Sequence, residues 1–441
     1  MFEPGIIVAP ATAQGGAIAI IRMSGEGAIA CCDRVFRGRR SLTEAKSHTL
    51  HYGTIVDGEH VIDDVLVSVF RSPHSYTGEE SIEISTHGSR YIVTEILSLL
   101  CRNGARMAEH GEFSARAFAA GRIDLSQAEA VADVIAADSR AAHTMALTQM
   151  RGGYSDTLKI LRNQLVELTA LLELELDFSE EDVEFADRTR LYAMLQHTCD
   201  VVRSLMQSFR TGNAIREGVG VAIVGAPNVG KSTLLNRLIG DDRAMVSDIA
   251  GTTRDTIEES IIIDDIRFRF IDTAGIRKTD DLLEQMGIDR TLKAIERADI
   301  IINMAEPNGA FEVLSLKDNQ CEIRLINKSD TTIHREISEA IYISARDGEG
   351  VDDLRAALRN TVDTEALYRG DAVVSNVRHF EALSAAYNAL MAAMTALTAD
   401  ISSELLAEDI RSAISHLGEI TGEITSDTIL QSIFSTFCIG K

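Results

Sequence analysis

The chain has 441 residues, of which 43 are Lys or Arg and 67 are Asp or Glu, so its formal net charge is −24. This balance excludes a protein whose main surface wraps nucleic acid, because such binding depends on neutralising phosphates with Lys and Arg. Any work on RNA would need a basic partner or a local basic patch. At roughly 150 residues per domain, the length predicts two to three domains.

The cysteine spacing indicates a reducing compartment, and the N-terminal residues do not have the pattern of a secretory signal. The six cysteines form no CxxC pair and have no disulfide-dense spacing. The first ten residues lack the charged head and apolar segment of a secretory signal, and no uncharged run approaches the ~20 residues of a membrane span. We expect a cytoplasmic protein that does not contact a membrane.

Residues 5–116 have the pattern of a mixed α and β domain. Apolar runs and strict alternation indicate strands, and Gly-containing dipeptides mark turns. The pattern predicts strands over residues 17–21, 65–70 and 81–85, turns at Asp57-Gly58 and Thr77-Gly78, and a helix over residues 91–100.

From residue 126 to about residue 210 the pattern becomes helical. Apolar side chains at spacings of three and four fall on one face of a helix, which is typical of a packing seam; they are Leu158, Leu161, Leu165, Leu168 and Leu172. The same helical spacing of apolar residues recurs at residues 380–397 and 405–417, after an α/β segment that ends near Asp363. Helices on both sides of a complete module suggest that the module is inserted into a helical domain.

The α/β segment begins with a phosphate-binding loop, Gly225-Ala-Pro-Asn-Val-Gly-Lys-Ser232. It follows the apolar run 219–224 and leads into a helical pattern, which is the context such a loop requires. Its glycines free backbone N–H groups to ring a phosphate chain, Lys231 reaches the outer phosphates, and the Ser232 hydroxyl ligates Mg²⁺. We expect a nucleoside triphosphate to contact Asn228, Val229, Gly230, Lys231, Ser232 and Thr233.

Two further motifs indicate that the base is guanine, and a third belongs to the phosphate end of the site. A carboxylate at Asp330, in Asn327-Lys328-Ser329-Asp330, can accept both N1–H and the exocyclic amine of guanine, whereas adenine offers no such donor pair. Ser344-Ala345-Arg346 would complete the base pocket, and Asp272-Thr273-Ala274-Gly275 would serve the Mg²⁺ shell and the terminal phosphate. Each motif alone could be a solvated turn, but their order, each at the end of a strand, favours a GTP site.

The segment from residue 246 to Asp255 has the hydroxyls and carbonyls of a mobile switch, with Thr253 as a second Mg²⁺ hydroxyl. Arg254 either acts as an arginine finger or pairs with Asp255. Ile276 stands where small signalling GTPases place a water-orienting Gln, so another group must position the nucleophile. Glu284 is the best local candidate, the alternative being a solvated loop of charges.

Motifs along the whole chain resemble the MnmE (TrmE) family of tRNA-modification GTPases. They are Ile-Val-Ala-Pro-Ala-Thr near the N-terminus, Arg22-Met-Ser-Gly, Tyr76-Thr-Gly-Glu, Gly111-Glu-Phe-Ser, Asp124-Leu-Ser-Gln-Ala-Glu-Ala, Asp248-Ile-Ala-Gly-Thr-Thr-Arg-Asp and the tail Phe437-Cys-Ile-Gly-Lys441. The resemblance implies a multidomain protein with α/β and all-α parts. Its parts would be an α+β folate-binding, dimerising domain (1–118), a discontinuous helical domain (119–213 and 373–441) and an inserted Ras-like P-loop GTPase domain (214–372).

The same resemblance implies that K⁺ supplies the positive charge of an arginine finger. The implied K⁺ ligands are Asn228, Ser247, Ile249 and Thr252, and the nucleotide would also contact Asp248, Ala250 and Gly251. The family's water-positioning glutamate corresponds to Glu284. Asn303 stands where an Asp is usual, a change that we expect to affect loop packing more than chemistry.

A folate site is implied in the N-terminal domain, for 5-formyl-tetrahydrofolate or 5,10-methylene-tetrahydrofolate. Its implied residues are Arg22, Glu83, Arg122 and Lys441, the glutamate suiting the pterin edge and the cations the ligand's carboxylates. Arg122 replaces the expected lysine and would hold the ligand with a fork of donors. Cys438 either takes part in the modification chemistry or is a small buried hydrophobe.

The function implied by the resemblance is that of a homodimeric, K⁺-dependent GTPase that forms a heterotetramer with the FAD- and NADH-dependent partner MnmG. The pair would install an aminomethyl or carboxymethylaminomethyl group at C5 of the wobble uridine of certain tRNAs, with the partner making most tRNA contacts. A ribosome-assembly or signalling GTPase would predict a basic RNA-binding appendage, which the composition does not suggest. A folate-dependent aminomethyltransferase would give no reason for an inserted GTPase.

Overall fold

The computed structural model describes residues 3–13, 15–177, 188–245, 259–271, 284–317, 319–331, 339–364, 367, 369, 371–399 and 403–440, without the side chains of residues 241–245, 284–290 and 331. The chain divides into two compact units. The first combines Met1–Ala132 with Ile414–Lys441, and the second is Asp133–Ala413. No helix in the described ranges combines the length and the apolar composition needed to cross a membrane.

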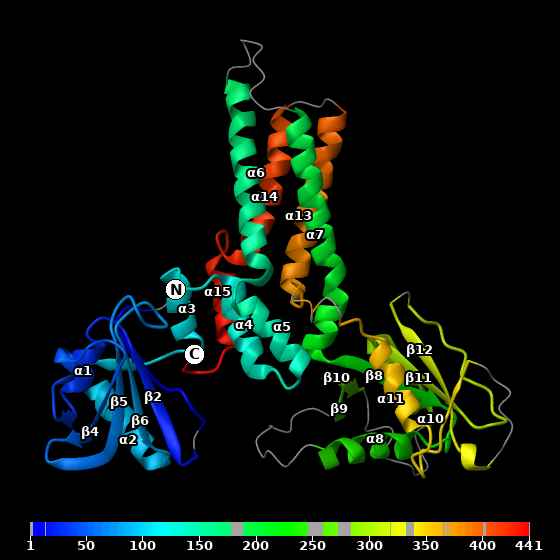
Figure 1. Ribbon diagram of the computed structural model, residues 1–441, viewed down its shortest axis with the longest axis horizontal. Helices are drawn as coiled ribbons and strands as arrows, with labels where there is room; N and C mark the ends of the chain where they lie inside the picture. The colour runs from blue at the N-terminus through cyan, green and yellow to red at the C-terminus, as the bar shows by residue number, and fades with distance from the viewer. Residues whose placement is uncertain are drawn as a thin grey trace. The chain divides into compact units, whose positions relative to one another are not determined.

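The first unit is built on a seven-stranded sheet in the order β3-β4-β5-β6-β2-β1-β7 (Figure 1). Buried and exposed residues alternate along β5, as expected for a strand with one face on the core. The strands are β1 (Ile6–Pro10), β2 (Ile18–Ser24), β3 (Phe36–Gly38), β4 (Thr49–Asp57), β5 (His60–Phe70), β6 (Ser81–His87) and β7 (Ala105–Met107). The three strands predicted in this region are confirmed as β2, β5 and β6.

Two helices, α1 (Ala28–Asp33) and α2 (Arg90–Arg102), pack against this sheet, with the short η1 (Leu42–Glu44) beside α1. The apolar positions of α2 recur at helical spacing, and Val93, Ile96, Leu99 and Leu100 are buried in the core of the unit. The helix predicted over residues 91–100 is therefore confirmed.

The C-terminal segment of the chain belongs to this same unit. Helix α15 (Asp427–Ser435) packs beside α3 (Glu112–Ala119) in a small core. That core contains Ala115, Leu125, Ala128, Leu430, Phe434 and Phe437. Gly111 has φ 66°, and a Cβ there would lie 2.4 Å from the carbonyl oxygen of Phe434, so only glycine allows this approach.

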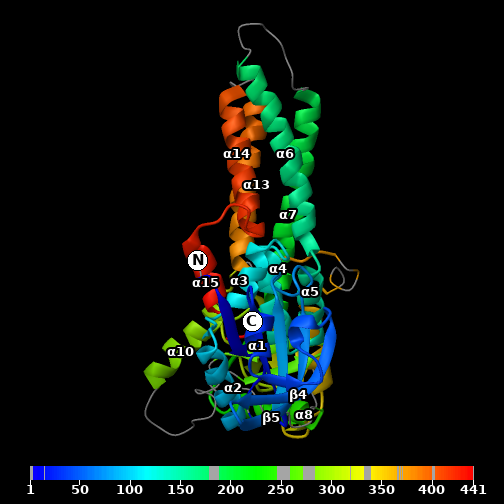
Figure 2. The same ribbon diagram turned by 90° about the vertical axis from the view of Figure 1, so that its left-hand side faces the viewer.

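The second unit contains long helices that lie side by side in both views (Figures 1 and 2). They are α6 (Gly153–Asp177), α7 (Arg188–Glu217), α13 (Val377–Thr398) and the part of α14 (Ser403–Thr421) that ends at Ala413, with α5 (Arg140–Met150) and the end of α4 (Leu125–Ala136) below them. The five leucines of the predicted seam on α6 are all buried, so that prediction is confirmed.

The chain leaves the helices for the α/β module and rejoins them at one place. A Cβ on Gly212, near the end of α7, would lie 2.2 Å from the carbonyl oxygen of Val374, just before α13. The two connections are thus packed against each other, as expected for an inserted module. The predicted boundaries at residues 118 and 213 fall inside α3 and α7, and the domain limits stay a prediction.

The inserted module is a doubly wound sheet in the order β13-β12-β11-β8-β10-β9, with only β9 antiparallel among the described strands. Helices α8 and α11 pack on one face of it, and α10 packs on the other. The elements are β8 (Val219–Gly225), α8 (Lys231–Met245), β9 (Glu259–Ile263), β10 (Ile266–Phe270), α10 (Glu284–Arg297), β11 (Ile300–Ala305), β12 (Cys321–Ile326), η3 (Ser329–Thr331), β13 (Ile341–Tyr342) and α11 (Val351–Asn360). This is the predicted Ras-like P-loop arrangement, in which ligands bind beyond the carboxyl ends of the parallel strands.

Candidate functional site

The phosphate-binding loop connects β8 to α8 at the carboxyl edge of the GTPase sheet. Its backbone has positive φ at Gly225 (141°), Asn228 (63°) and Gly230 (104°), while the Val229 side chain is buried beneath it. Asn228 is exposed and Ser232 is half-buried in the first turn of α8. The loop therefore turns backbone N–H groups and the start of a helix toward one point, which is an anion-binding arrangement.

Lys231 is folded onto its own loop. Its Nζ donates to the carbonyl oxygens of Gly225 (2.6 Å) and Ala226 (2.9 Å). Burial lowers the pKa of this ammonium group, and the nearby Glu312 carboxylate acts in the opposite direction. A phosphate chain would offer Lys231 stronger, charge-assisted acceptors than these two carbonyls.

Asn327 joins three loops of the nucleotide site. Its Nδ2 donates to the carbonyl oxygen of Val229 (2.7 Å), and its Oδ1 accepts the backbone N–H of Ala345 (2.9 Å). The side chain is buried, and a Cβ on Gly230 would lie 2.2 Å from Nδ2. This one amide therefore fixes the phosphate loop, the loop after β12 and the loop after β13 relative to one another.

The other predicted base-pocket residues lie on the same two loops. Asp330 is in η3 and is exposed, as is Arg346. The Ser344 hydroxyl donates to the Asp347 carboxylate (2.8 Å) and shapes the turn after β13. Lys328, with φ 63°, pairs with the Glu306 carboxylate. The structure thus brings the Asn327 and Ser344 motifs to one edge, with the Asp330 carboxylate facing solvent.

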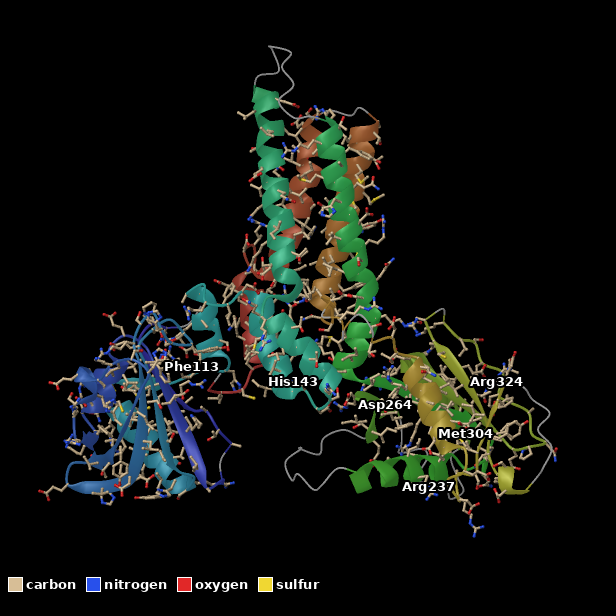
Figure 3. The ribbon with its side chains drawn as sticks, viewed as in Figure 1. Phe113, His143, Arg237, Asp264, Met304 and Arg324 are labelled. Carbon is tan, nitrogen blue, oxygen red and sulfur yellow. The ribbon has the colours of Figure 1, made fainter. Side chains whose placement is uncertain are left out.

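The β11–β12 crossover contains no helix in its described residues and is held instead by Asn303. This residue lies within β11, which continues to Ala305, and not in the loop that follows the strand. Its buried Nδ2 donates to the Glu312 carbonyl (2.8 Å) and to the Glu322 carboxylate (2.7 Å), and its Oδ1 accepts the Glu312 N–H (3.2 Å). Asn303 therefore orders the loop that carries Glu312 toward Lys231. Figure 3 marks its neighbour Met304 on β11 and Arg324 on β12.

Several predicted residues lie outside the described residues: Ser247, Asp248, Ile249, Ala250, Gly251, Thr252, Thr253, Arg254, Asp272, Thr273, Ala274, Gly275 and Lys441. Glu284 begins α10, but its side chain is not described. The predictions made for these positions stay predictions.

In the first unit, Arg22 and Glu83 face each other across β2 and β6. They are register partners, and the guanidinium donates from Nε (2.9 Å) and Nη2 (2.8 Å) to Oε1 of Glu83. The Arg22 guanidinium also lies over the Phe113 ring, 5.9 Å from its centroid. The pair is half-buried, so one carboxylate and one guanidinium are fixed together where a ligand can reach them.

The C-terminal tail reaches this pair. Arg22 Nη1 donates to the carbonyl oxygen of Gly440 (3.1 Å), although 418 residues separate them. Two positions before Gly440, Cys438 is exposed and carries a free thiol. The alternative of Cys438 as a small buried hydrophobe is therefore wrong.

A hydroxyl cluster lies beside the Arg22–Glu83 pair. The Tyr76 hydroxyl is 2.9 Å from the Ser114 hydroxyl, and burial raises the pKa of Tyr76 while Ser114 and the charge of Arg22 act against the rise. Arg122 is exposed, and the aliphatic part of its side chain lies beside Gly78. A Cβ added to Gly78 would be 3.5 Å from the Cγ of Arg122. Arg22, Glu83 and the tail are thus brought together, whereas no hydrogen bond links Arg122 to them among the described contacts.

The sequence motifs assign no role to Glu112, although its buried charge supports this site. Glu112 is 0% exposed and accepts from Arg106 (2.6 Å), Arg116 (2.9 Å) and the Glu109 N–H (3.0 Å). Burial alone would raise the pKa of Glu112, but these hydrogen bonds hold it below the usual range. Its place in Gly111-Glu-Phe-Ser, within an otherwise apolar helix start, is the only sequence signal that could have identified it.

Two family models match the chain. The model described as GTP-binding protein TrmE N-terminus matches residues 6–122, and the model described as MnmE helical domain matches residues 125–438. Among solved structures, the FeoB G-domain from Methanococcus jannaschii aligns over 32% of this chain and 96% of that chain at 19% identity, with a TM-score of 0.22.

Curated relatives are similar over the full length. The tRNA modification GTPase MnmE of Bacteroides thetaiotaomicron is 47% identical over 460 residues, covering 99% of each chain. The proteins of that name from Bacteroides fragilis and Flavobacterium psychrophilum are each 48% identical, also covering 99% of each chain.

Proposed function

Because this chain belongs to the MnmE (TrmE) family of tRNA modification GTPases, we propose that it hydrolyses GTP with the help of K⁺ to drive modification of the wobble uridine of certain tRNAs. That the chain is a GTPase of tRNA modification follows from the family. The cation, the partner and the chemistry at C5 of the uridine, an aminomethyl or carboxymethylaminomethyl group, are the proposal.

The observation that carries the proposal is the return of the tail to the first unit. Arg22 binds both Glu83 and the Gly440 carbonyl, so three groups from distant parts of the chain meet at one place outside the GTPase module. A GTPase that acted only as a ribosome-assembly or signalling switch would have no use for such a built site. A cluster of donors and acceptors there fits a ligand with a polar heterocycle and carboxylates, as a tetrahydrofolate has.

In the GTPase module the described residues would bind and orient the nucleotide. The phosphate loop and Lys231 would hold the phosphates, Asn327 would keep the base and phosphate loops in register, and Asp330 would accept from guanine. Ser232 and Thr253 would ligate Mg²⁺, and Asn228, Ser247, Ile249 and Thr252 would hold K⁺, which supplies positive charge at the transferring phosphate. Asn228 is exposed on the loop with φ 63°, which suits a ligand role; Glu284 would orient the attacking water.

In the first unit Glu83 would accept from the pterin edge of 5-formyl- or 5,10-methylene-tetrahydrofolate. Arg22 donates to Oε1 of Glu83 through both Nε and Nη2, so Oε2 would be the acceptor for the ligand. Arg122 and Lys441 would contact the ligand's carboxylates, and Cys438 would take part in the modification. The folate would provide the carbon of the new group.

The proposal includes a homodimer and a heterotetramer with the FAD- and NADH-dependent protein MnmG, in the cytoplasm. Because the net charge of −24 disfavours binding to phosphates, it supports an assembly in which the partner makes most contacts with tRNA.

The test is mass spectrometry of tRNA nucleosides from a strain lacking this gene. We expect the modified wobble uridine to disappear and to return with the wild-type gene but not with a Lys231→Ala variant. Unchanged nucleosides in the deletion strain would refute the modification function and favour the ribosome-assembly alternative.

A further inference from the structure

His110 holds the C-terminal tail at two points that flank Cys438. It lies between β7 and α3, and its Nδ1 is 2.9 Å from the carbonyl oxygen of Phe437. Its backbone forms an antiparallel bridge with Ile439. Since a carbonyl only accepts, Nδ1 carries the proton and donates it. The residue on either side of Cys438 is therefore attached to His110.

The backbone that carries His110 is fixed on both sides. Before it, the Glu109 N–H donates to the buried Glu112 carboxylate (3.0 Å). After it, Gly111 packs so closely on Phe434 that no side chain fits. Glu112 is itself held by Arg106 and Arg116. An imidazole mounted on this segment can hold another segment in a defined place.

The far end of the tail has its own attachments. Arg22 donates to the Gly440 carbonyl, and a Cβ on Gly440 would lie 2.2 Å from the Pro10 carbonyl oxygen. These contacts hold residue 440, and the Phe437 ring is buried against Phe434, whereas the Phe437 carbonyl and the backbone of Ile439 are bound by His110. With the imidazole removed, the Phe437 carbonyl would lose its donor, and the segment that carries Cys438 would be held only by the buried Phe437 ring, the backbone bridge at Ile439 and the contacts of Gly440.

We propose that His110 is a positioning residue that holds residues 437–440 against the first unit, so that Cys438 and the Gly440 carbonyl stay at the Arg22–Glu83 site. The inference rests on the function proposed for that site. His110 acts through the tail and touches no substrate. The imidazole serves as a fixed N–H donor to the Phe437 carbonyl.

The direct test is amide hydrogen exchange of the C-terminal peptide in the full-length protein. His110→Leu keeps the side-chain bulk without the donor, whereas His110→Asn offers Nδ2 in place of Nδ1. One hydrogen bond of ordinary strength corresponds to roughly two- to tenfold faster exchange of residues 437–440 in the Leu variant. The Asn variant should exchange as the wild type does. His60→Leu, an exposed histidine at the β4–β5 turn, is the matched control and should change nothing.

The functional arm uses the same variants. We expect His110→Leu to lower 5-formyl-tetrahydrofolate affinity and tRNA modification, His110→Asn to restore both, and GTP hydrolysis to stay normal throughout. Exchange that is unchanged in the Leu variant, or faster exchange with normal folate binding and modification, would overturn the inference. If the wild type itself binds no folate and modifies no tRNA, the proposed function fails, and the positioning role fails with it even where exchange shows the tail held by His110.

Discussion

The Nη1 of Arg22 donates a hydrogen bond to the carbonyl oxygen of Gly440 at 3.1 Å, which joins the second strand of the chain to its next-to-last residue. The same guanidinium is held by Glu83 through Nε and Nη2. Its donors are therefore divided between a neighbouring strand and the tail, and any change to the tail alters the surroundings of the Arg22–Glu83 pair.

Deleting residues 438–441 should weaken 5-formyl-tetrahydrofolate binding and abolish tRNA modification. A lost hydrogen bond to a charged group costs about 1.5–3 kcal/mol, or roughly ten- to hundredfold in affinity. Isothermal titration calorimetry measures the change, and K⁺-stimulated GTP hydrolysis by the truncated protein should persist. Equal folate affinity with and without the tail would place its role elsewhere.

Hydrolysis of GTP should be slow in Na⁺ and rise strongly in K⁺. If Asn228 and the switch hold K⁺ at the transferring phosphate, removing that charge costs several kcal/mol of transition-state stabilisation. Asn228→Ala should abolish the response to K⁺ while leaving GDP affinity nearly intact. Turnover measured in matched chloride salts decides this, and equal rates in both salts would contradict a cation site.

Glu284→Ala should lower the hydrolysis rate severely and change nucleotide affinity little. The expected contact is to a water that matters only in the transition state, so its loss appears in kcat and not in binding. Single-turnover hydrolysis together with fluorescent-nucleotide titration separates the two quantities. A variant that hydrolyses GTP normally would assign Glu284 to a solvated loop of charges.

Asn327→Ala should lower GDP affinity roughly thirtyfold or more, because it leaves the Val229 carbonyl and the Ala345 N–H buried without their partner, at about 1–3 kcal/mol each and so about 2 kcal/mol or more together. Nucleotide titration measures the loss. Asn319→Ala, which removes an exposed amide from the same module, is the control. Wild-type affinity in Asn327→Ala would show that the three loops hold their places without this amide.

The buried Glu112 should make the first unit sensitive to acid. Its folded-state pKa is lowered, so its ion pairs stabilise the fold above the pKa of an unfolded glutamate, about 4.3, and this contribution is lost as the pH falls through the lower folded-state value. At pH 7, Glu112→Gln leaves Arg106 and Arg116 without a buried counter-charge and should cost about 3–5 kcal/mol.

Hydrogen exchange of the peptides covering β7 and α3 measures the local unfolding of this region separately from the rest of the chain. The difference in exchange rate between the wild type and Glu112→Gln should become smaller as the pH is lowered toward 3. Glu59→Gln, at an exposed turn, should show no difference at any pH. If the two proteins still differed in exchange rate at acid pH, the charge of Glu112 would not be what stabilises the unit.

Local patterns predicted much of the fold because they depend on near neighbours. The leucine stripe of α6 follows from helical spacing, and β8 and its loop follow from an apolar run that ends in glycines. Contacts between distant segments have no local signal. No residue near His110 in the sequence indicates that it contacts Phe437. The sequence pattern assigns Asn327 to the base site, but its amide also binds the phosphate loop. Asn303 likewise looked like the start of a loop, and its role inside β11 depends on Glu312 and Glu322.

The joining of Met1–Ala132 with Ile414–Lys441 in one unit has a consequence for how the protein is made. A ribosome produces the sheet early, but α15 and the residues that meet Arg22 and His110 only at the end. At about 5–20 residues per second, translation of Asp133–Ala413 takes roughly 15–60 s, during which the surface around Ala115 and Phe118 lacks its cover. The nascent chain therefore exposes this apolar surface for most of its synthesis, and a prematurely terminated chain would keep it exposed and be open to chaperones and proteases.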